Sequence, residues 1–153
     1  MKKVLLLGAS GSIGTQTLDI IRQYPNEFEL VGFSVGKNKE KAKEILGEFK
    51  SVKCVYISKK EHAKSLKEFH KEISVFSGKC GFRKLIKKSD FDMCVDALVG
   101  FVGLEPAIHV LKKPCTEVIF PCARAFTLNS HNRQQVIRIR SILINVFICL
   151  SRC

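Results

Sequence analysis

The chain begins with an apolar strand, a turn that contains three glycines and the start of a helix. Residues 2–7 read Lys-Lys-Val-Leu-Leu-Leu, and Gly8, Gly11 and Gly14 follow at intervals of three. Such glycines let the backbone turn tightly and bring its N–H groups close to a ligand, while the helix N-terminus adds partial positive charge. This pattern predicts a phosphate-binding loop for a nucleotide; the alternative is an ordinary glycine-rich turn.

The segment after the turn indicates which nucleotide binds. Apolar residues occupy one face of a helix expected at residues 12–24, Pro25 ends that helix, and residues 28–33 are expected to form a second strand. In dinucleotide-binding units, an acidic residue at this second strand contacts the ribose of NAD. Here residues 34–39, which follow this strand, contain Lys37 and Lys39 and no carboxylate before Glu40. Lysines facing a 2′-phosphate predict NADP, and the alternative is that both are solvated loop charges.

Strands and helices alternate over residues 1–113. Further helices are expected at residues 39–49, 58–69, 81–88 and 104–111, and further strands at residues 52–57, 73–76 and 93–99. The alternation predicts an α/β, Rossmann-like fold with a doubly wound, mostly parallel sheet and helices on both faces. The loops Gly8–Gly14, Gly36–Asn38 and Gly100–Gly103 should then converge in one crevice at the carboxyl ends of the strands.

The net charge of +12 raises the question of nucleic-acid binding. Over residues 37–72, however, lysines alternate with glutamates at helical spacing, which is typical of solvated helix faces. No basic strand lined with aromatic residues is present. We therefore expect no nucleic-acid partner.

The seven cysteines include no C-x-x-C pair, and their odd number favours reduced thiols over disulfides or a zinc site. Cys54, Cys80 and Cys94 are expected to be buried apolar side chains. The leading apolar run, Val4–Leu7, is too short for the core of a secretory signal, and the stretch Ile142–Leu150 is too short to span a bilayer. A cytoplasmic protein with no membrane partner is expected.

Two longer stretches extend the pattern beyond the glycines. The first runs from Leu7 to Asp19 and continues through Tyr24 and Pro25 into residues 35–38, Val-Gly-Lys-Asn. The second, residues 95–106, reads Val-Asp-Ala-Leu-Val-Gly-Phe-Val-Gly-Leu-Glu-Pro. Over about residues 1–113 the chain resembles the N-terminal, NADPH-binding domain of the 1-deoxy-D-xylulose 5-phosphate reductoisomerase family.

The resemblance implies which residues contact NADPH. They are Gly8, Ser10, Gly11, Ser12, Ile13 and Gly14 around the pyrophosphate, and Gly36, Lys37 and Asn38 at the adenosine phosphate. Ser10 stands where the family usually has threonine. The second stretch corresponds to the strand and glycine loop that approach the nicotinamide side in the family.

Family members convert a sugar phosphate, 1-deoxy-D-xylulose 5-phosphate, into 2-C-methyl-D-erythritol 4-phosphate in non-mevalonate isoprenoid synthesis. The resemblance implies an oxidoreductase in which a skeletal rearrangement to an aldehyde precedes hydride transfer from NADPH. A Mg or Mn ion polarises the substrate's oxygens. The resemblance also implies a homodimer, built largely through the part that follows this domain in the family.

The sequence changes character after Lys113. Residues 1–113 contain nineteen Lys and all ten Gly, whereas residues 114–153 contain neither. The family's Leu-Ala-Asn-Lys-Glu motif does not follow, and Glu117 is the only carboxylate after position 105. One carboxylate cannot hold a hard metal ion, so this chain is expected to carry no metal ligand and no catalytic residue. His109 and His131 are expected to lie on the surface rather than to bind metal.

We hypothesise that the reading frame shifts near codon 113. Residues 1–113 would then be an NADPH-binding domain whose sheet is incomplete at its C-terminal end and lacks its final strand. Residues 114–153 would be a divergent tail that is not native domain sequence. The chain would carry only the cofactor-binding part and be inactive alone.

Two other functions are compatible with parts of the sequence. Semialdehyde dehydrogenases use a similar glycine turn, but they need a cysteine nucleophile after asparagine, and this chain has no Asn-Cys pair. The second is a stand-alone NADP-binding or regulatory interaction module, in which the basic tail binds an acidic partner.

Overall fold

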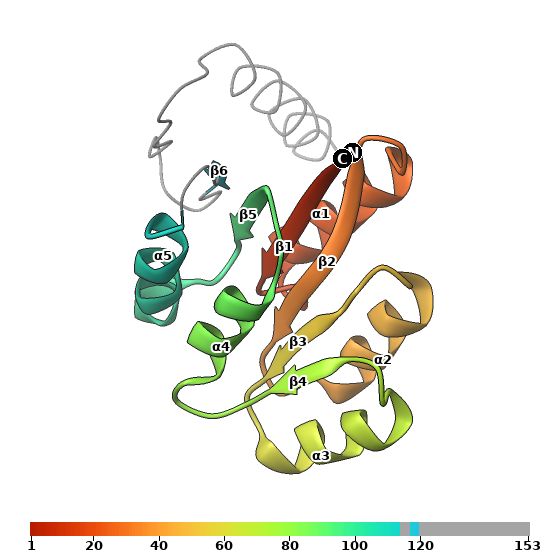
Figure 1. Ribbon diagram of the computed structural model, residues 1–153, viewed down its shortest axis with the longest axis vertical. Helices are drawn as coiled ribbons and strands as arrows, with labels where there is room; N and C mark the ends of the chain where they lie inside the picture. The colour runs from red at the N-terminus through yellow and green to blue at the C-terminus, as the bar shows by residue number, and fades with distance from the viewer. Residues whose placement is uncertain (114–116, 120–153) are drawn as a thin grey trace.

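A six-stranded parallel sheet forms the centre of the computed structural model, which describes residues 1–113 and 117–119 (Figure 1). The strands are β1 Lys2–Leu7, β2 Phe28–Val35, β3 Cys54–Ile57, β4 Ser74–Phe76, β5 Met93–Asp96 and β6 Glu117–Ile119. Their order is β4-β3-β2-β1-β5-β6, and all neighbouring pairs are parallel. The strand order therefore reverses between β1 and β5, which is where such sheets bind ligands.

Helices cover both faces of this sheet. They are α1 Ser12–Gln23, α2 Lys39–Glu48, α3 Lys60–Phe69, α4 Gly81–Lys88 and α5 Leu104–Leu111, and a 3₁₀ helix, η1 Gly100–Gly103, precedes α5. Buried residues of α1, α2 and α3 pack in one apolar cluster against one face, and those of α4 and α5 pack in a second cluster against the other. The predicted doubly wound α/β fold is confirmed.

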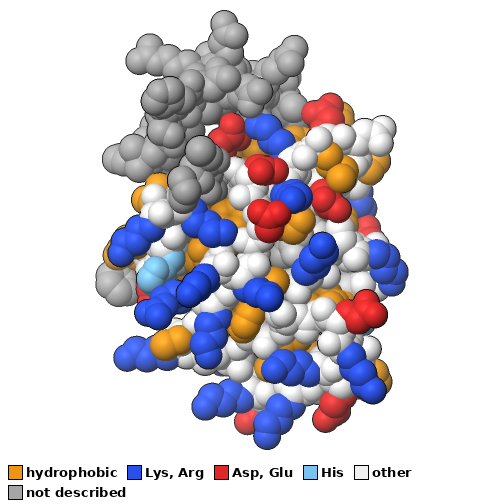
Figure 2. Space-filling model, viewed as in Figure 1, with side chains coloured by type: hydrophobic (Ala, Val, Ile, Leu, Met, Phe, Trp, Pro, Cys, Tyr) orange, Lys and Arg blue, Asp and Glu red, His pale blue; other side chains and the backbone are white. Residues whose placement is uncertain are grey.

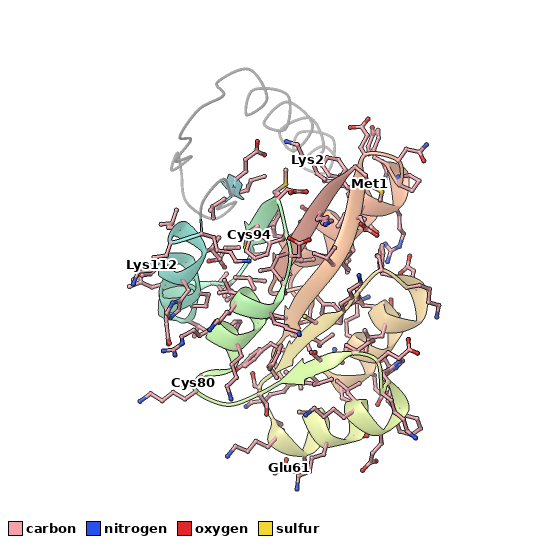
Figure 3. The ribbon with its side chains drawn as sticks, viewed as in Figure 1. Met1, Lys2, Glu61, Cys80, Cys94 and Lys112 are labelled. Carbon is pink, nitrogen blue, oxygen red and sulfur yellow. The ribbon has the colours of Figure 1, made fainter. Side chains whose placement is uncertain are left out.

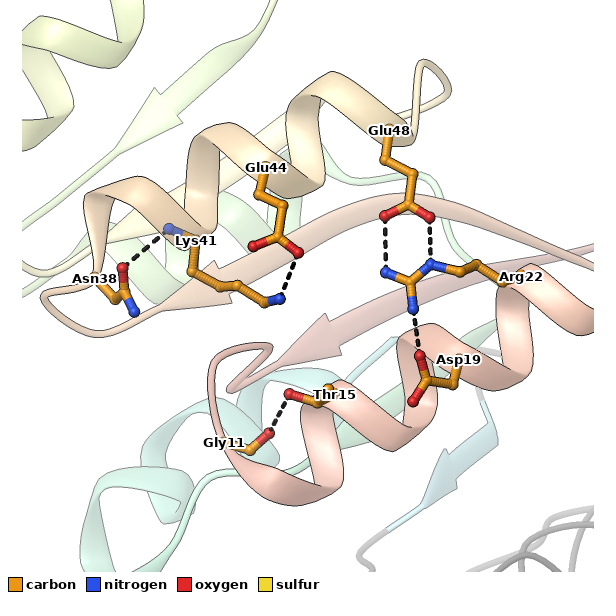
Figure 4. A network of polar contacts seen from close by, with 8 residues as sticks. All are labelled: Gly11, Thr15, Asp19, Arg22, Asn38, Lys41, Glu44 and Glu48. Atoms are coloured by element: carbon orange, nitrogen blue, oxygen red, sulfur yellow. Dashed lines mark hydrogen bonds and ion pairs between the residues drawn. The ribbon is translucent and has the colours of Figure 1, made fainter.

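A network of polar contacts joins the first two helices (Figure 4). The guanidinium of Arg22 on α1 donates to the carboxylates of Asp19 and Glu48, with Nη2 lying 2.7 Å from Oε2 of Glu48. Asn38 caps α2 by accepting a hydrogen bond from the backbone N–H of Lys41 at 2.9 Å. The contacts between Arg22 and Glu48 hold the two helices together on the face that the α1–α3 cluster occupies.

The expectation that the sheet lacks a final strand after residue 113 is wrong. β6 pairs with β5 in parallel register, with Val118 opposite Cys94, and the side chain of Val118 is buried. Nζ of Lys2 on β1 lies 3.1 Å from a carboxylate oxygen of Glu117. Three residues of a segment expected to be non-native therefore belong to the sheet.

The strand expected at residues 93–99 is shorter than predicted. β5 ends at Asp96, and the next residues turn into η1, which the sequence did not predict. Gly100 adopts a φ of +72°, a conformation that is incompatible with continued strand. The chain thus leaves the sheet beside the start of α1.

The cysteines do not all lie where they were expected (Figure 3). Cys54 and Cys94 are buried in the sheet, as predicted, but Cys80 is exposed. Cys80 directly precedes α4 and belongs to neither apolar cluster, so its side chain does not pack in the core.

Lysine and arginine side chains spread over the visible surface with acidic side chains among them (Figure 2). Several are paired along a helix, as Lys41 is with Glu44 at 2.7 Å and Lys43 with Glu40 at 3.4 Å. Among residues 1–113 and 117–119, no helix is long and apolar enough to cross a membrane.

If β6 is part of the folded domain, then Val118→Ala should lower the free energy of unfolding by about 1–2 kcal/mol, because a buried side chain leaves a cavity against β5. Urea unfolding followed by circular dichroism measures this change. Val99→Ala is the matched control, since Val99 is 75% exposed, and it should change stability by less than about 0.5 kcal/mol. If both variants changed the free energy of unfolding equally, β6 would not be part of the folded core.

Candidate functional site

The glycine loop after β1 is attached to the neighbouring strand β2. Gly8 has a φ of +85°, a left-handed conformation in which the chain turns out of β1 into the loop. That N–H donates to Oγ of Ser34 at 2.9 Å, and the N–H of Ala9 donates to the carbonyl of Ser34 at 2.8 Å. Ser34 is buried, so two hydrogen bonds shielded from water fix the start of the loop.

Close backbone packing fixes the other side of the loop. A Cβ on Gly8 would lie 2.9 Å from the carbonyl oxygen of Ala97, and a Cβ on Gly14 would lie 2.2 Å from the carbonyl oxygen of Gly8. Neither space can hold a side chain. The glycines at these two positions therefore let α1 begin directly against the loop and let β5 approach it.

The first turn of α1 presents backbone donors at this edge of the sheet. Gly11 is the N-cap and offers no capping side chain, and the first intrahelical bond is donated by the N–H of Thr15 to the carbonyl of Gly11 at 2.9 Å. The N–H groups of Ser12, Ile13 and Gly14 precede that bond and so have no partner within the helix. Ser10, Gly11 and Ser12 are exposed. This arrangement can bind an anion such as a phosphate.

The second predicted loop lies next to the first, at the carboxyl end of β2. Gly36, Lys37 and Asn38 are all exposed, and a Cβ on Gly36 would meet nothing within 4 Å. Asn38 uses its side-chain oxygen to cap α2, which leaves its NH₂ group for a ligand. Lys37 makes no ion pair with any residue that the structure describes. The structure thus brings all nine predicted residues to one edge of the sheet, in the segments that follow the adjacent strands β1 and β2.

A buried carboxyl group lies on the other side of the glycine loop, at the end of β5. Asp96 is only 4% exposed, and its Oδ1 accepts a hydrogen bond from the N–H of Leu98 at 3.2 Å. Burial raises the pKa of Asp96 to about 6. Burial also raises the pKa of the Cys94 thiol, which lies on the same face of β5, well above its usual value.

The sequence prediction did not select Asp96 as a site residue, although the signal was present. Asp96 is the one charged residue within the apolar run from Met93 to Val99, and it directly precedes the glycine loop around Gly100. A carboxylate at the carboxyl end of a central parallel strand is a general indication of a site residue.

No cluster of three or more potential metal ligands exists among the described residues. His109 on α5 lies 4.0 Å from the carboxylate of Glu105 on the same helix, and the structure shows no third ligand-type side chain with them. His131 lies outside the described residues, as does the stretch Ile142–Leu150.

A family model described as 1-deoxy-D-xylulose 5-phosphate reductoisomerase matches residues 4–117. The chain belongs to this family. It is 42% identical to the 1-deoxy-D-xylulose 5-phosphate reductoisomerase of Macrococcus caseolyticus and 41% identical to that of Listeria innocua, each over 112 residues. These alignments cover 73% of this chain but 29% of each relative. The chain therefore spans less than a third of the length of these reductoisomerases.

Solved reductoisomerase structures share the fold. A DOX-P reductoisomerase crystallised with NADPH, fosmidomycin and magnesium superposes with a TM-score of 0.71 at 24% identity, over 79% of this chain and 30% of that one. The Zymomonas mobilis reductoisomerase in complex with NADPH gives a TM-score of 0.63 at 21% identity, over 72% and 29% of the two chains. The shared fold of the reductoisomerase family agrees with the parallel sheet and its two helical layers.

The contact between Gly14 and the glycine loop gives a stability prediction. Gly14→Ala should cost about 3 kcal/mol or more, because its new Cβ would overlap the carbonyl oxygen of Gly8 and the Cα of Ala9, and both are backbone atoms. Thermal or urea unfolding measures the loss.

Gly47→Ala is the matched control, because Gly47 lies in α2 and a Cβ there would meet nothing within 4 Å. Alanine at that position should raise stability by about 0.5–1 kcal/mol through its better helix propensity. A Gly14→Ala protein as stable as the natural chain would show that α1 does not pack against the loop as described.

Proposed function

We propose that this chain is the NADPH-binding part of a 1-deoxy-D-xylulose 5-phosphate reductoisomerase. The observation that carries the proposal is the glycine loop, which Ser34 fixes by two hydrogen bonds and which lies where the strand order reverses. It leads into the first turn of α1, where the N–H groups of Ser12 and Ile13 have no partner within the helix. Family membership and the NADPH named for two reductoisomerase structures support it. The nucleotide-binding domain comprises residues 1–113 together with β6.

We assign the pyrophosphate to the loop and the first turn of α1. Ser10, Gly11 and Ser12 are exposed there, Gly8 and Gly14 allow the close packing, and Ile13 contributes its backbone N–H. The exposed Gly36, Lys37 and Asn38 are assigned to the adenosine end, because the carboxyl end of β2 is adjacent to that of β1. The ammonium of Lys37 then faces the 2′-phosphate of NADP.

The complete reaction requires residues beyond this domain. We propose that the whole protein rearranges and reduces 1-deoxy-D-xylulose 5-phosphate with NADPH and Mg or Mn, as a cytoplasmic homodimer. The chain after position 105 has a single carboxylate, Glu117, and its side chain pairs with Lys2. Residues 114–153 hold no set of hard metal ligands, which favours a divergent tail and predicts that this chain alone is inactive.

The preference for NADP should depend on Lys37. In calorimetric titrations, the natural chain should bind NADP⁺ at least tenfold more tightly than NAD⁺. Lys37→Ala should weaken NADP⁺ binding about three- to tenfold and leave NAD⁺ binding unchanged, since only the 2′-phosphate loses its cation.

Lys50→Ala is the matched control for charge, because Lys50 is also exposed but lies between α2 and β3, at the opposite edge of the sheet. This variant should bind both nucleotides as the natural chain does. Equal affinities for NADP⁺ and NAD⁺ in the natural chain would contradict the assignment of Lys37.

The activity of the isolated chain separates a damaged enzyme from an interaction module. We expect no oxidation of NADPH above background when the chain is incubated with 1-deoxy-D-xylulose 5-phosphate and Mg or Mn, because the carboxylates that would hold the metal are missing. Turnover would disprove this account of the tail. A stand-alone module would instead bind NADP⁺ and retain an acidic partner that it loses when residues 120–153 are deleted.

A further inference from the structure

Asp96 places a carboxyl group one strand away from the phosphate-binding loop. It is the last residue of β5, and it pairs in register with Leu7, the residue immediately before Gly8. The following residue, Ala97, is the one whose carbonyl oxygen would lie 2.9 Å from a Cβ on Gly8. Asp96 is therefore built into the part of the sheet against which the glycine loop packs.

The Asp96 carboxyl also holds the turn between β5 and η1. Its Oδ1 accepts from the N–H of Leu98 at 3.2 Å, and a Cβ on Gly103 would lie 3.5 Å from the same oxygen. Leu98 and Gly103 belong to the two ends of the exposed turn that includes Gly100. Through its hydrogen bond with Leu98, the carboxyl fixes where this turn leaves the sheet beside the loop.

No cation neutralises this carboxyl within the described part of the chain. Its partner on β1 is Leu7, which Gly8 follows, and η1 contains no ionisable residue. On β5 itself, the Cys94 thiol is the ionisable group that senses its charge.

Ionisable side chains on α5, on β6 and at Lys113 have partners of their own. On α5, Glu105 and His109 face each other, and on β6 Glu117 pairs with Lys2. Beyond α5, Lys113 donates to the carbonyl of Ser89. Within the described residues, no side-chain cation therefore offsets the negative charge of an ionised Asp96 beside the loop.

We propose that Asp96 sets the nucleotide affinity of this site, because its carboxyl positions the turn at Leu98–Gly100 while its negative charge opposes the phosphates on the adjacent loop. The inference rests on the proposed binding of NADP. It follows that the protonated form of Asp96, which keeps the position of the turn but carries no charge, binds the nucleotide more tightly than the ionised form.

The balance between the two forms changes near neutrality. Burial raises the pKa of Asp96 to about 6, so the carboxyl is mostly neutral at pH 5 and mostly ionised at pH 8. Repulsion of the phosphates is therefore absent at the lower pH and present at the higher. The 2′-phosphate of NADP⁺ loses a proton over the same range, so the two effects must be separated by comparing variants at each pH.

The experiment measures the dissociation constant of NADP⁺ by calorimetry at pH 5 and pH 8 for the full chain and three variants. Asp96→Asn keeps an oxygen for the Leu98 N–H without the charge, and Asp96→Ala removes both. Asp92→Asn is the matched control, because Asp92 lies directly before β5 at the opposite edge of the sheet, is exposed, and would keep its acceptor for the N–H of Lys3. The amide signal of Leu98 is followed by NMR in the same samples without nucleotide.

Asp96→Asn should bind NADP⁺ about three- to tenfold more tightly than the natural chain at pH 8, and within about twofold of it at pH 5. Asp96→Ala should bind more weakly than Asp96→Asn at both pH values, and Asp92→Asn should match the natural chain. The Leu98 signal should shift with a midpoint near pH 6 in the natural chain and not in Asp96→Asn.

The inference would be overturned if Asp96→Asn and the natural chain differed in NADP⁺ affinity by the same factor at pH 5 and at pH 8. Nucleotide binding itself would still be established by that result. An Asp96→Ala chain that binds as tightly as Asp96→Asn would also overturn the inference. If the natural chain binds no NADP⁺ while its Leu98 signal still titrates, the proposed function fails, and the effect of Asp96 on affinity fails with it.

Discussion

The contact between the carbonyl of Gly8 and the backbone of Gly14 is the constraint on which the site depends. With no room for a Cβ at either glycine, α1 starts only a short loop after β1, and its first N–H groups lie at the edge of the sheet where the strand order reverses. Ser34 then fixes the loop from β2, and Ala97 closes it from β5. Three strands that are distant in sequence thus position one short loop, and its ability to bind an anion follows from backbone geometry rather than from side chains.

Regular features of the sequence were sufficient to predict most of the fold. The apolar stripe of α1 and the stop at Pro25 gave that helix to within a residue or two, and the alternation of strands and helices gave the parallel sheet with two helical layers. The nine predicted cofactor residues lie on adjacent loops, because parallel strands necessarily present their carboxyl ends at one edge. What they contact stays a prediction that the binding experiments test.

The features that sequence patterns missed depend on tertiary contacts. Ser34 resembles any polar residue near the end of a strand, and its role is visible only because β2 lies beside β1 with its hydroxyl toward the N–H of Gly8. The 3₁₀ turn after Asp96 depends on Gly100 at positive φ and on the hydrogen bond from Leu98. Cys80 was expected in the core on composition alone, but its place before α4 leaves it exposed.

β6 adds an edge strand to the sheet without adding a set of metal ligands among the described residues. A strand at the edge of this sheet has few requirements. It needs backbone groups that pair with β5, one apolar side chain that packs in the α4–α5 cluster, and a charge complementary to Lys2. Glu117, Val118 and Ile119 meet these requirements without the family's motif. Metal-assisted chemistry requires several carboxylates in a fixed arrangement. Residues 118–153 contain no aspartate or glutamate. A short edge strand can therefore form where a metal site cannot, and the match to the family model reaches residue 117, the first residue of β6.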